Sequence, residues 1–207
     1  MTGASSGIGF ELAKQFADNG FDLLVTAEDS GLGPAAAQLR GAGTQVQPAH
    51  ADLSSYGGVE ELYSAIVLKD MAARDDGRVL ITSSIASTMP GSFQAVYNAS
   101  KSFLRSFAEA LQNEVKDTNV TITSLMPGPT DTNFFHRADM DDTRVGQSSK
   151  DDPVQVAKQG FDALMEGKDK IISGSVMTKA RGAASRVLPD KLKAAAHRQM
   201  AEPGSGH

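Results

Sequence analysis

The stretch Thr2-Gly3-Ala4-Ser5-Ser6-Gly7-Ile8-Gly9 decides how the remaining sequence is interpreted. Its three glycines permit a tight turn and let the backbone come close to a pyrophosphate. Apolar residues then recur at helical spacing from Phe10 to Ala17, which predicts a helix starting at the turn. The free N–H groups and the positive dipole end of such a helix favour an anion. A close strand–helix contact without any ligand is the alternative explanation for the glycines.

Strands and helices are predicted to alternate along the rest of the chain. Short apolar or β-branched runs predict strands at 21–27, 44–50, 78–83, 119–126 and 170–173. Helical periodicity predicts helices at 35–39, 59–73, 98–116 and 154–165. This alternation is typical of an α/β fold whose parallel sheet is covered on both faces.

Composition excludes several classes of protein. The 207 residues carry a net charge of −5, whereas a nucleic-acid-binding protein normally carries a basic excess. The absence of cysteine excludes disulfides, thiolate nucleophiles and cysteine-ligated metals, and it fits a cytoplasmic location. No apolar run approaches the roughly 20 residues that a membrane helix needs, and no secretory signal is visible at the start. We therefore expect neither a nucleic-acid partner nor a membrane.

A second motif is Tyr97-Asn98-Ala99-Ser100-Lys101. Tyr97 and Lys101 lie four residues apart, so on a helix they share one face. A free phenol has a pKa of about 10, and a nearby ammonium lowers it by favouring the phenolate. Such a tyrosine can serve as an acid or base near neutral pH. An ordinary surface pair is the alternative.

A third feature is Ser84, which follows the predicted strand 78–83. Ligands bind at the carboxyl ends of strands in open α/β sheets. A hydroxyl there can donate to a substrate carbonyl oxygen as that oxygen gains negative charge. The alternative is a turn that is merely rich in serine and threonine.

Together these residues resemble the short-chain dehydrogenase/reductase family. Five motifs occur in the family's order over residues 2–132: the glycine turn, Asp52, Ser84, Tyr97-x-x-x-Lys101 and Pro127-Gly128-x-x-x-Thr132. The resemblance implies a Rossmann-like doubly wound parallel sheet of about five strands in a single domain, residues 1–175, followed by a basic tail at 176–207. It also implies an oxidoreductase that moves a hydride between a nicotinamide and a small-molecule carbonyl or alcohol.

The resemblance assigns roles to individual residues. Tyr97 is the proton donor or acceptor, Lys101 lowers its pKa and holds the nicotinamide ribose, and Ser84 orients the substrate oxygen. The segment 134–152 covers the substrate, and the helix 98–116 belongs to a dimer-forming surface, which implies a homo-oligomer. The residues implied in cofactor binding are Gly3, Ser5, Gly7, Ile8, Gly9, Glu28, Asp52, Leu53, Tyr97, Lys101, Pro127, Gly128, Thr130 and Thr132.

The choice of cofactor and the absence of a metal rest on acidic residues. Glu28 and Asp29 follow the second predicted strand, where carboxylates repel a 2′-phosphate and accept from ribose hydroxyls. We therefore expect NAD in preference to NADP, unless these carboxylates only form a solvated turn. The acidic run at 139–142 does not fit a calcium loop, because Arg144 and Lys150 would fall at positions 6 and 12. No metal is expected.

The sequence departs from the family pattern in two places. Only Met1 precedes the glycine turn, so the family's first strand is expected to be absent, and no Asn-Asn-Ala-Gly strand end occurs. The helix 59–73 looks like the front of one family helix joined to the back of another. Without those two strands, the remaining five are expected to divide into groups of two and three. Either the two groups close onto each other in a smaller sheet or the chain folds poorly, and in both cases catalysis is expected to be impaired. The alternatives are a nucleotide-binding or assembly protein without turnover, and a fragment without independent function.

Overall fold

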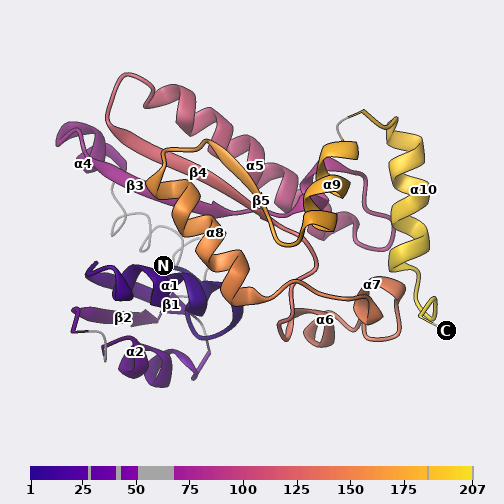
Figure 1. The fold of residues 1–207 in the computed structure, drawn as a ribbon, viewed down its shortest axis with the longest axis horizontal. Helices are drawn as coiled ribbons and strands as arrows, with labels where there is room; N and C mark the ends of the chain where they lie inside the picture. Colours follow the sequence, from indigo (N-terminus) through magenta and orange to yellow (C-terminus); the bar gives the residue numbers. More distant parts are fainter. Residues whose placement is uncertain (28, 41–42, 51–67, 186, 207) are drawn as a thin grey trace. The chain divides into compact units, whose positions relative to one another are not determined.

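The computed structural model describes residues 1–27, 29–40, 43–50, 68–185 and 187–206. The chain divides into two compact units, Met1–Gly77 and Arg78–His207. A two-stranded sheet and a three-stranded sheet hold the five strands of the described ranges (Figure 1). The predicted α/β class is confirmed, and so is the division of the strands into two and three. The grouping of 1–175 as one domain with a tail at 176–207 stays a prediction.

The first unit is built on the parallel pair β1 (Leu23–Ala27) and β2 (Val46–His50). Helix α1 (Gly7–Asp18) lies before β1, α2 (Leu32–Arg40) joins the two strands, and α4 (Leu68–Ala73) follows later in the chain. A core formed by apolar side chains of α1, β1, α2 and β2 holds these four elements together. The buried members of this core include Leu12, Ala13, Ala17, Val25, Leu32, Ala36 and Leu39.

The start of the chain adds one bridge to this small sheet. Thr2 pairs in parallel with Thr26 of β1, and the backbone N–H of Thr26 donates to the carbonyl of Met1 at 2.7 Å. The N–H of Ala4 donates in turn to the carbonyl of Thr26 at 3.2 Å. The family resemblance implies a whole strand before the glycine turn. In the described part of the chain, the isolated β-bridge between Thr2 and Thr26 stands at that place.

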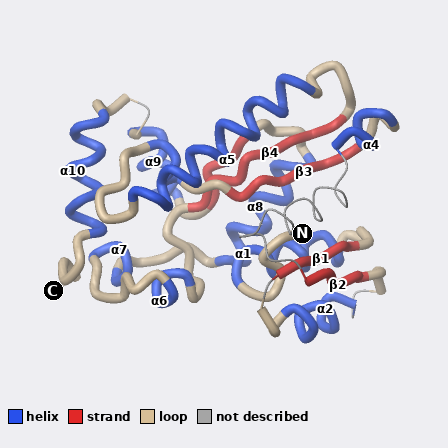
Figure 2. The backbone as a smooth tube through the Cα atoms, turned by 180° about the vertical axis from the view of Figure 1, so that it is seen from behind, coloured by secondary structure: helices blue, strands red, loops and turns tan. Residues whose placement is uncertain are grey.

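The second unit contains the sheet β3 (Gly77–Thr82), β4 (Val120–Pro127) and β5 (Lys170–Ser173), with β4 in the centre. β4 and β5 are parallel, with Ser124 opposite Lys170. β4 is buried along almost its whole length. Both α5 (Ala95–Glu114) and α8 (Pro153–Met165) contact it (Figure 2). Its nearly continuous burial, which includes the hydroxyl side chains of Thr123 and Ser124, follows from this cover by two helices.

Shorter elements complete the second unit. The 3₁₀ helix η1 (Ile85–Thr88) follows β3, while α6 (Phe134–Arg137) and α7 (Arg144–Gln147) occupy the segment expected to cover the substrate. Helices α9 (Val176–Ala184) and α10 (Asp190–Ala201) form the C-terminal part. Ala201 of α10 packs against Phe135 and Met140, and the N–H of Gly204 donates to Asp142 at 2.7 Å. The end of the chain is therefore bound to the segment 134–147.

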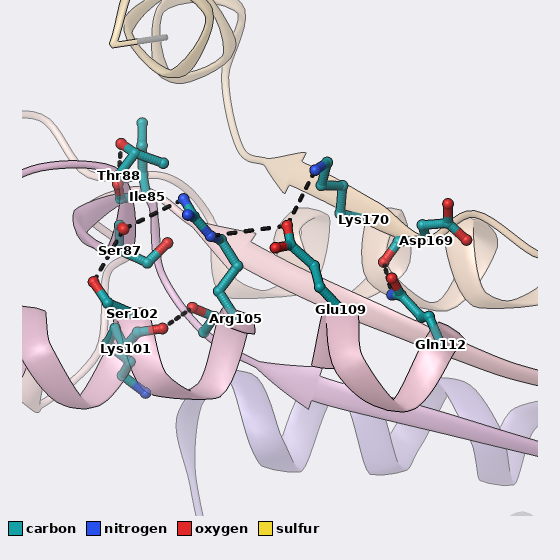
Figure 3. Close-up of polar contacts among 11 residues, drawn as sticks. Ile85, Ser87, Thr88, Lys101, Ser102, Arg105, Glu109, Gln112, Asp169 and Lys170 are labelled. Carbon is teal, nitrogen blue, oxygen red and sulfur yellow. Dashed lines mark hydrogen bonds and ion pairs between the residues drawn. The ribbon is translucent and has the colours of Figure 1, made fainter. Parts of the chain in front are cut away.

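Helix α5 has one polar, anchored face and one exposed, aromatic face. On the polar face, Ser102 donates to the carbonyl of Ser87, Glu109 pairs with Lys170, and Gln112 donates to the carbonyl of Asp169 (Figure 3). On the other side of the helix, the rings of Phe103 and Phe107 stack 5.8 Å apart and are 65% and 43% exposed. Among the described helices, none combines the length and the apolar character that a membrane span requires.

Candidate active site

The structure brings Tyr97 and Ser84 together. Tyr97 lies in the first turn of α5, and Ser84, only 7% exposed, caps the start of η1 by accepting from the N–H of Ala86 at 3.1 Å. The two hydroxyls lie close enough together for Ser84 to lower the pKa of the Tyr97 phenol. The Ser84 hydroxyl is also 3.4 Å from the carbonyl oxygen of Pro127, to which it can donate. Two hydroxyls thus meet just beyond β3, as the spacing of the motifs predicts.

Lys101 lies beside the tyrosine ring, one helical turn further along α5. Its Nζ is 5.7 Å from the centroid of the Tyr97 ring and donates to the carbonyl of Thr82 at 3.2 Å. Burial lowers the pKa of Lys101. The ammonium therefore faces the ring and a backbone carbonyl, and it is more easily neutralised than an exposed lysine.

The pKa of Tyr97 moves in the direction opposite to the expected one. Burial of the phenol raises this pKa, and the hydrogen bond from Ser84 only partly opposes the rise. Lys101 does not lower it here, because its Nζ is engaged by Thr82 and lies over the ring face rather than at the hydroxyl. The phenol is consequently protonated at neutral pH, the state that a proton donor needs.

Asn98 is a positioning residue that the sequence argument missed. Its side chain is buried, and its Nδ2 donates to the carbonyls of Ala86 and Met89, both at 3.1 Å. A Cβ on Gly91 would lie 2.2 Å from the Asn98 side chain, so only glycine fits there. Asn98 holds the turn after Ser84 against the helix that carries Tyr97. The one available signal was an amide inside the tyrosine motif.

The loop after β4 lies close to this pair. Thr130 is buried and donates to the carbonyl of Gly128 at 2.9 Å, while Thr132 accepts from the N–H of Phe134 at 3.3 Å. The ring of Phe134 packs 5.2 Å from the ring of Tyr97, centroid to centroid. The start of the segment 134–152 therefore contacts the tyrosine, as the family resemblance implies for a segment that covers the substrate.

The glycine turn forms in the first unit as its sequence predicts. Gly3 and Gly7 have φ angles of 63° and 59°, a conformation that side chains rarely adopt. A Cβ on Gly9 would lie 2.1 Å from the carbonyl oxygen of Gly3, so the helix packs directly on the turn. Ser6, at the N-cap of α1, makes no side-chain capping bond, and Ile8 is half-buried. The close contact with Gly3 is therefore sufficient to explain why position 9 is a glycine. The backbone N–H groups in the first turn of α1 receive no hydrogen bond from the Ser6 side chain.

An aspartate at the end of β1 is bound to this turn. Ser5 donates to one carboxylate oxygen of Asp29 at 2.7 Å, and the N–H of Gly31 donates to the other at 2.8 Å. A carboxylate therefore lies beside a residue implied in cofactor binding. Glu28, Asp52 and Leu53 lie outside the described residues, so their predicted roles stay predictions.

The acidic run at 139–142 is engaged within the protein. Asp141 pairs with Nδ1 of His136 at 2.7 Å, and this pairing raises the pKa of the exposed imidazole. Asp142 accepts from Gly204. Within the described ranges, no group of three or more histidine, aspartate or glutamate side chains has an arrangement that could hold a metal ion.

The structure combines an α/β fold with a tyrosine, a serine and a lysine at the end of a strand. Comparison with known proteins identifies the family that has this combination. The family model for short chain dehydrogenases matches residues 1–69 and 62–143. The chain belongs to the short-chain dehydrogenase family. The two matched segments overlap at residues 62–69, within the range 59–73 that the sequence predicts as a junction of two family helices; residues 51–67 lie outside the described residues.

Curated relatives share part of their length with this chain. Dehydrogenase/reductase SDR family member 7B of Rattus norvegicus is 31% identical over 124 residues, which are 57% of this chain and 38% of the relative. The 3-ketodihydrosphingosine reductase of Bos taurus is 37% identical over 117 residues, 54% of this chain and 35% of the relative. The matched part of the chain thus spans well under half the length of these relatives.

Solved structures share the fold. A short-chain dehydrogenase from Sphingobium yanoikuyae, in complex with NADPH, superimposes with a TM-score of 0.73 at 20% identity, covering 91% of this chain and 95% of the other. A bulky-bulky ketone specific alcohol dehydrogenase from Comamonas testosteroni gives a TM-score of 0.73 at 17% identity, covering 91% and 93%. At these identities the likeness concerns the Rossmann-like fold alone.

Proposed function

We propose that the chain is a nicotinamide-dependent oxidoreductase in which Tyr97 transfers the proton to or from a carbonyl or alcohol oxygen. The neighbouring hydroxyls of Tyr97, at the start of α5, and of Ser84, at the start of η1, carry this proposal. Two neighbouring hydroxyls can both contact one substrate oxygen. Ser84 then donates to the oxygen as it gains negative charge, and the protonated phenol of Tyr97 completes the reduction by giving up its proton.

Each unit, taken by itself, contains residues that suit one part of a dinucleotide. The left-handed glycines and the start of α1, which lacks a side-chain cap, leave backbone N–H groups for a pyrophosphate. In the second unit, Lys101 and the loop with Thr130 and Thr132 are the residues for the nicotinamide ribose and ring. When bound, the nicotinamide supplies or accepts the hydride. The chain's own part is to orient the substrate oxygen and move the proton.

The position of Asp29 supports NAD over NADP. Its carboxylate is exposed at the turn and accepts from Ser5. A negative charge there repels a 2′-phosphate, whereas it can accept from a ribose hydroxyl. We expect kcat/KM with NADH to exceed that with NADPH. Replacing Asp29 with Asn should reduce the ratio of the two values roughly tenfold, about 1.4 kcal/mol of discrimination. An unchanged ratio would show that Asp29 takes no part in the choice.

The substrate-covering segment supports a substrate with an apolar group beside its carbonyl. Phe134, the first residue of α6, is 37% exposed and packs against Tyr97. An apolar group at the reacting carbon can extend the contact between these two rings. This assignment rests on the oxidoreductase proposal and names a class of substrate only.

We further propose that turnover is slow. The strands of the described residues form a two-stranded and a three-stranded sheet, whereas the family resemblance implies one continuous sheet. Hydride transfer tolerates little misplacement, and about 1 Å can reduce the rate roughly 100-fold. The family match in two overlapping segments supports the same view, because family helices joined at 62–69 would omit the strand between them.

A homo-oligomer and a cytoplasmic location complete the proposal. The stacked rings of Phe103 and Phe107 form an exposed aromatic pair on α5, the helix that the resemblance places in a dimer surface. Light scattering of wild-type protein and of Phe103→Asp should show a dimer becoming a monomer. Equal masses would contradict the proposal that this surface forms a dimer.

The absence of cysteine supports a cytoplasmic location, and cell fractionation tests that location.

The experiment that tests the function compares wild type with Tyr97→Phe. NADH oxidation is followed in the presence of a panel of ketones and aldehydes, and NADH binding is titrated by fluorescence. The variant should lose about 100-fold or more in kcat, the range expected of general acid catalysis, while binding NADH as wild type does. Lys158→Ala, which removes an exposed ion pair with Asp162 on the surface of α8, is the control.

Three results separate the rival functions. Binding with turnover that depends on Tyr97 supports the oxidoreductase. Binding without turnover in wild type supports a nucleotide-binding or assembly protein instead. Failure to bind NADH and NADPH would contradict both. A turnover number in the ordinary range of enzymes, about 1–1,000 per second, would refute the proposal of slow turnover.

A further inference from the structure

Asp151 is a buried carboxylate that the chemistry described so far does not use. It is 8% exposed and follows the segment that contains α7. Its Oδ1 accepts from the backbone N–H of Ser175 at 2.9 Å, and its Oδ2 accepts from the hydroxyl of Thr178 at 2.7 Å. Both donors are neutral. Burying a carboxylate costs free energy unless hydrogen bonds compensate for the lost water, so an aspartate at this buried position requires an explanation.

The backbone of Asp151 is bonded to the loop after β4. Its N–H donates to the carbonyl of Pro129 at 2.7 Å, and its carbonyl accepts from the N–H of Asp131 at 2.9 Å. These bonds make a parallel bridge between Asp151 and Thr130. One residue therefore joins the loop at 127–132, through its backbone, to the start of α9, through its side chain.

Two glycines pack closely against the Asp151 carboxylate and its partner Thr178. A Cβ on Gly174 would lie 2.1 Å from Oδ2 of Asp151, and a Cβ on Gly128 would lie 2.5 Å from Cγ2 of Thr178. Gly128 is one of the residues that the resemblance implies in cofactor binding. The loop thus packs directly on the side chain of Thr178, which is itself bonded to Asp151.

We propose that Asp151 is a positioning residue for the nicotinamide end of the cofactor. It acts through the loop 127–132, whose position it sets by linking that loop to Ser175 and Thr178. The proposal rests on the proposed oxidoreductase function and adds a residue to its machinery. The glycine turn, which lies in the other unit, is held by its own contacts. Asp151 is therefore specific to one end of the dinucleotide.

The test compares two ligands, NADH and ADP, on the full chain. ADP contains the pyrophosphate and adenosine but no nicotinamide, so it probes the glycine turn alone. Asp151→Ala removes both side-chain bonds, and it should weaken NADH binding about 10-fold while changing ADP binding less than twofold. Asp151→Asn keeps an oxygen for Ser175 and an amide that can donate to the Thr178 hydroxyl. It should restore NADH binding to within about threefold of wild type.

Asp152→Ala is the matched control. This neighbouring carboxylate is exposed and caps α8 by accepting from the N–H of Val154 at 3.0 Å. Its loss should lower the melting temperature, since an N-cap contributes about 1 kcal/mol, yet leave both dissociation constants unchanged. A general loss of stability would move NADH and ADP binding together, whereas a positioning role moves NADH alone.

Failure of the inference is distinguishable from failure of the proposed function. Wild-type protein that binds neither NADH nor NADPH overturns the function, and the inference with it. Wild-type protein that binds NADH, together with an Asp151→Ala variant whose NADH and ADP affinities change equally or not at all, overturns the inference alone. Selective loss of NADH binding that Asp151→Asn restores supports it.

Discussion

The glycine turn at 2–9 and the loop at 127–132 are both assigned to the cofactor, yet different contacts hold them. In the turn, Gly9 packs on the carbonyl of Gly3, a contact within eight residues of sequence. In the loop, the backbone is bonded to Asp151, whose side chain is bonded to residues 24 and 27 positions further on. The first arrangement depends on backbone shape, and the second depends on long-range hydrogen bonds. Substitutions should therefore affect the two regions differently.

The largest effect is expected at Gly9. Its Cβ would lie 2.1 Å from a backbone oxygen that cannot move without opening the turn, so Gly9→Ala should lower the free energy of unfolding by about 2–4 kcal/mol. Gly33→Ala, in α2, is the control because nothing lies within 4 Å of its Cβ. It should be neutral or stabilising by up to about 1 kcal/mol. Urea denaturation measures both, and equal effects would refute the packing role of Gly9.

A somewhat smaller effect is expected at Gly174, beside the loop. Gly174→Ala combines a φ of 122° with a clash against Asp151, so it should lower the free energy of unfolding by about 2–3 kcal/mol. Gly167 has a φ of 70° and nothing within 4 Å, so Gly167→Ala should cost only about 1–2 kcal/mol of backbone strain. The difference in unfolding free energy isolates the contact with Asp151. Equal losses of unfolding free energy in the two variants would mean that the Asp151 side chain moves away from the added Cβ without cost.

The smallest effect is expected at Ser5. Its hydroxyl bonds to Asp29 on the surface, so Ser5→Ala should change the free energy of unfolding by no more than about 0.5 kcal/mol. Thermal melting of the variant checks this value. A loss above about 2 kcal/mol would show that the glycine turn also depends on a distant side chain, which would erase the contrast between the two regions.

The same contrast explains which parts of the molecule were predictable from sequence. The strands, the glycine turn and the helices α1, α2, α5 and α8 follow from periodicity and local backbone geometry, and the five predicted strands lie within a few residues of the observed ones. The predicted helix 59–73 lies mostly outside the described residues. Helix α5 begins at Ala95, three residues before its predicted start, because the turn after η1 leads directly into it. The meeting of Ser84 with Tyr97 followed from motif spacing and the family resemblance.

Other features depend on contacts that no local pattern encodes. Asn98 and Asp151 hold their loops through bonds to carbonyls and hydroxyls far away in sequence, so composition and periodicity are silent about them. The expected lowering of the Tyr97 pKa by Lys101 was wrong, because helical spacing gives a shared face but not the burial of the phenol or the bond from Lys101 to Thr82. Side-chain environment, rather than spacing, decides the direction of a pKa shift.

The protonation state of Tyr97 tests the central claim most directly. Because burial raises its pKa, the phenol keeps its proton above the ordinary value of about 10. Titration of Tyr97 should therefore not change the rate of NADH-dependent carbonyl reduction between about pH 6 and pH 9. The rate of alcohol oxidation, which needs the phenolate, should still be rising at about pH 10. The measurement is the pH profile of both directions in wild type and in Tyr97→Phe. A fall in carbonyl reduction near neutral pH that disappears in Tyr97→Phe would contradict the account.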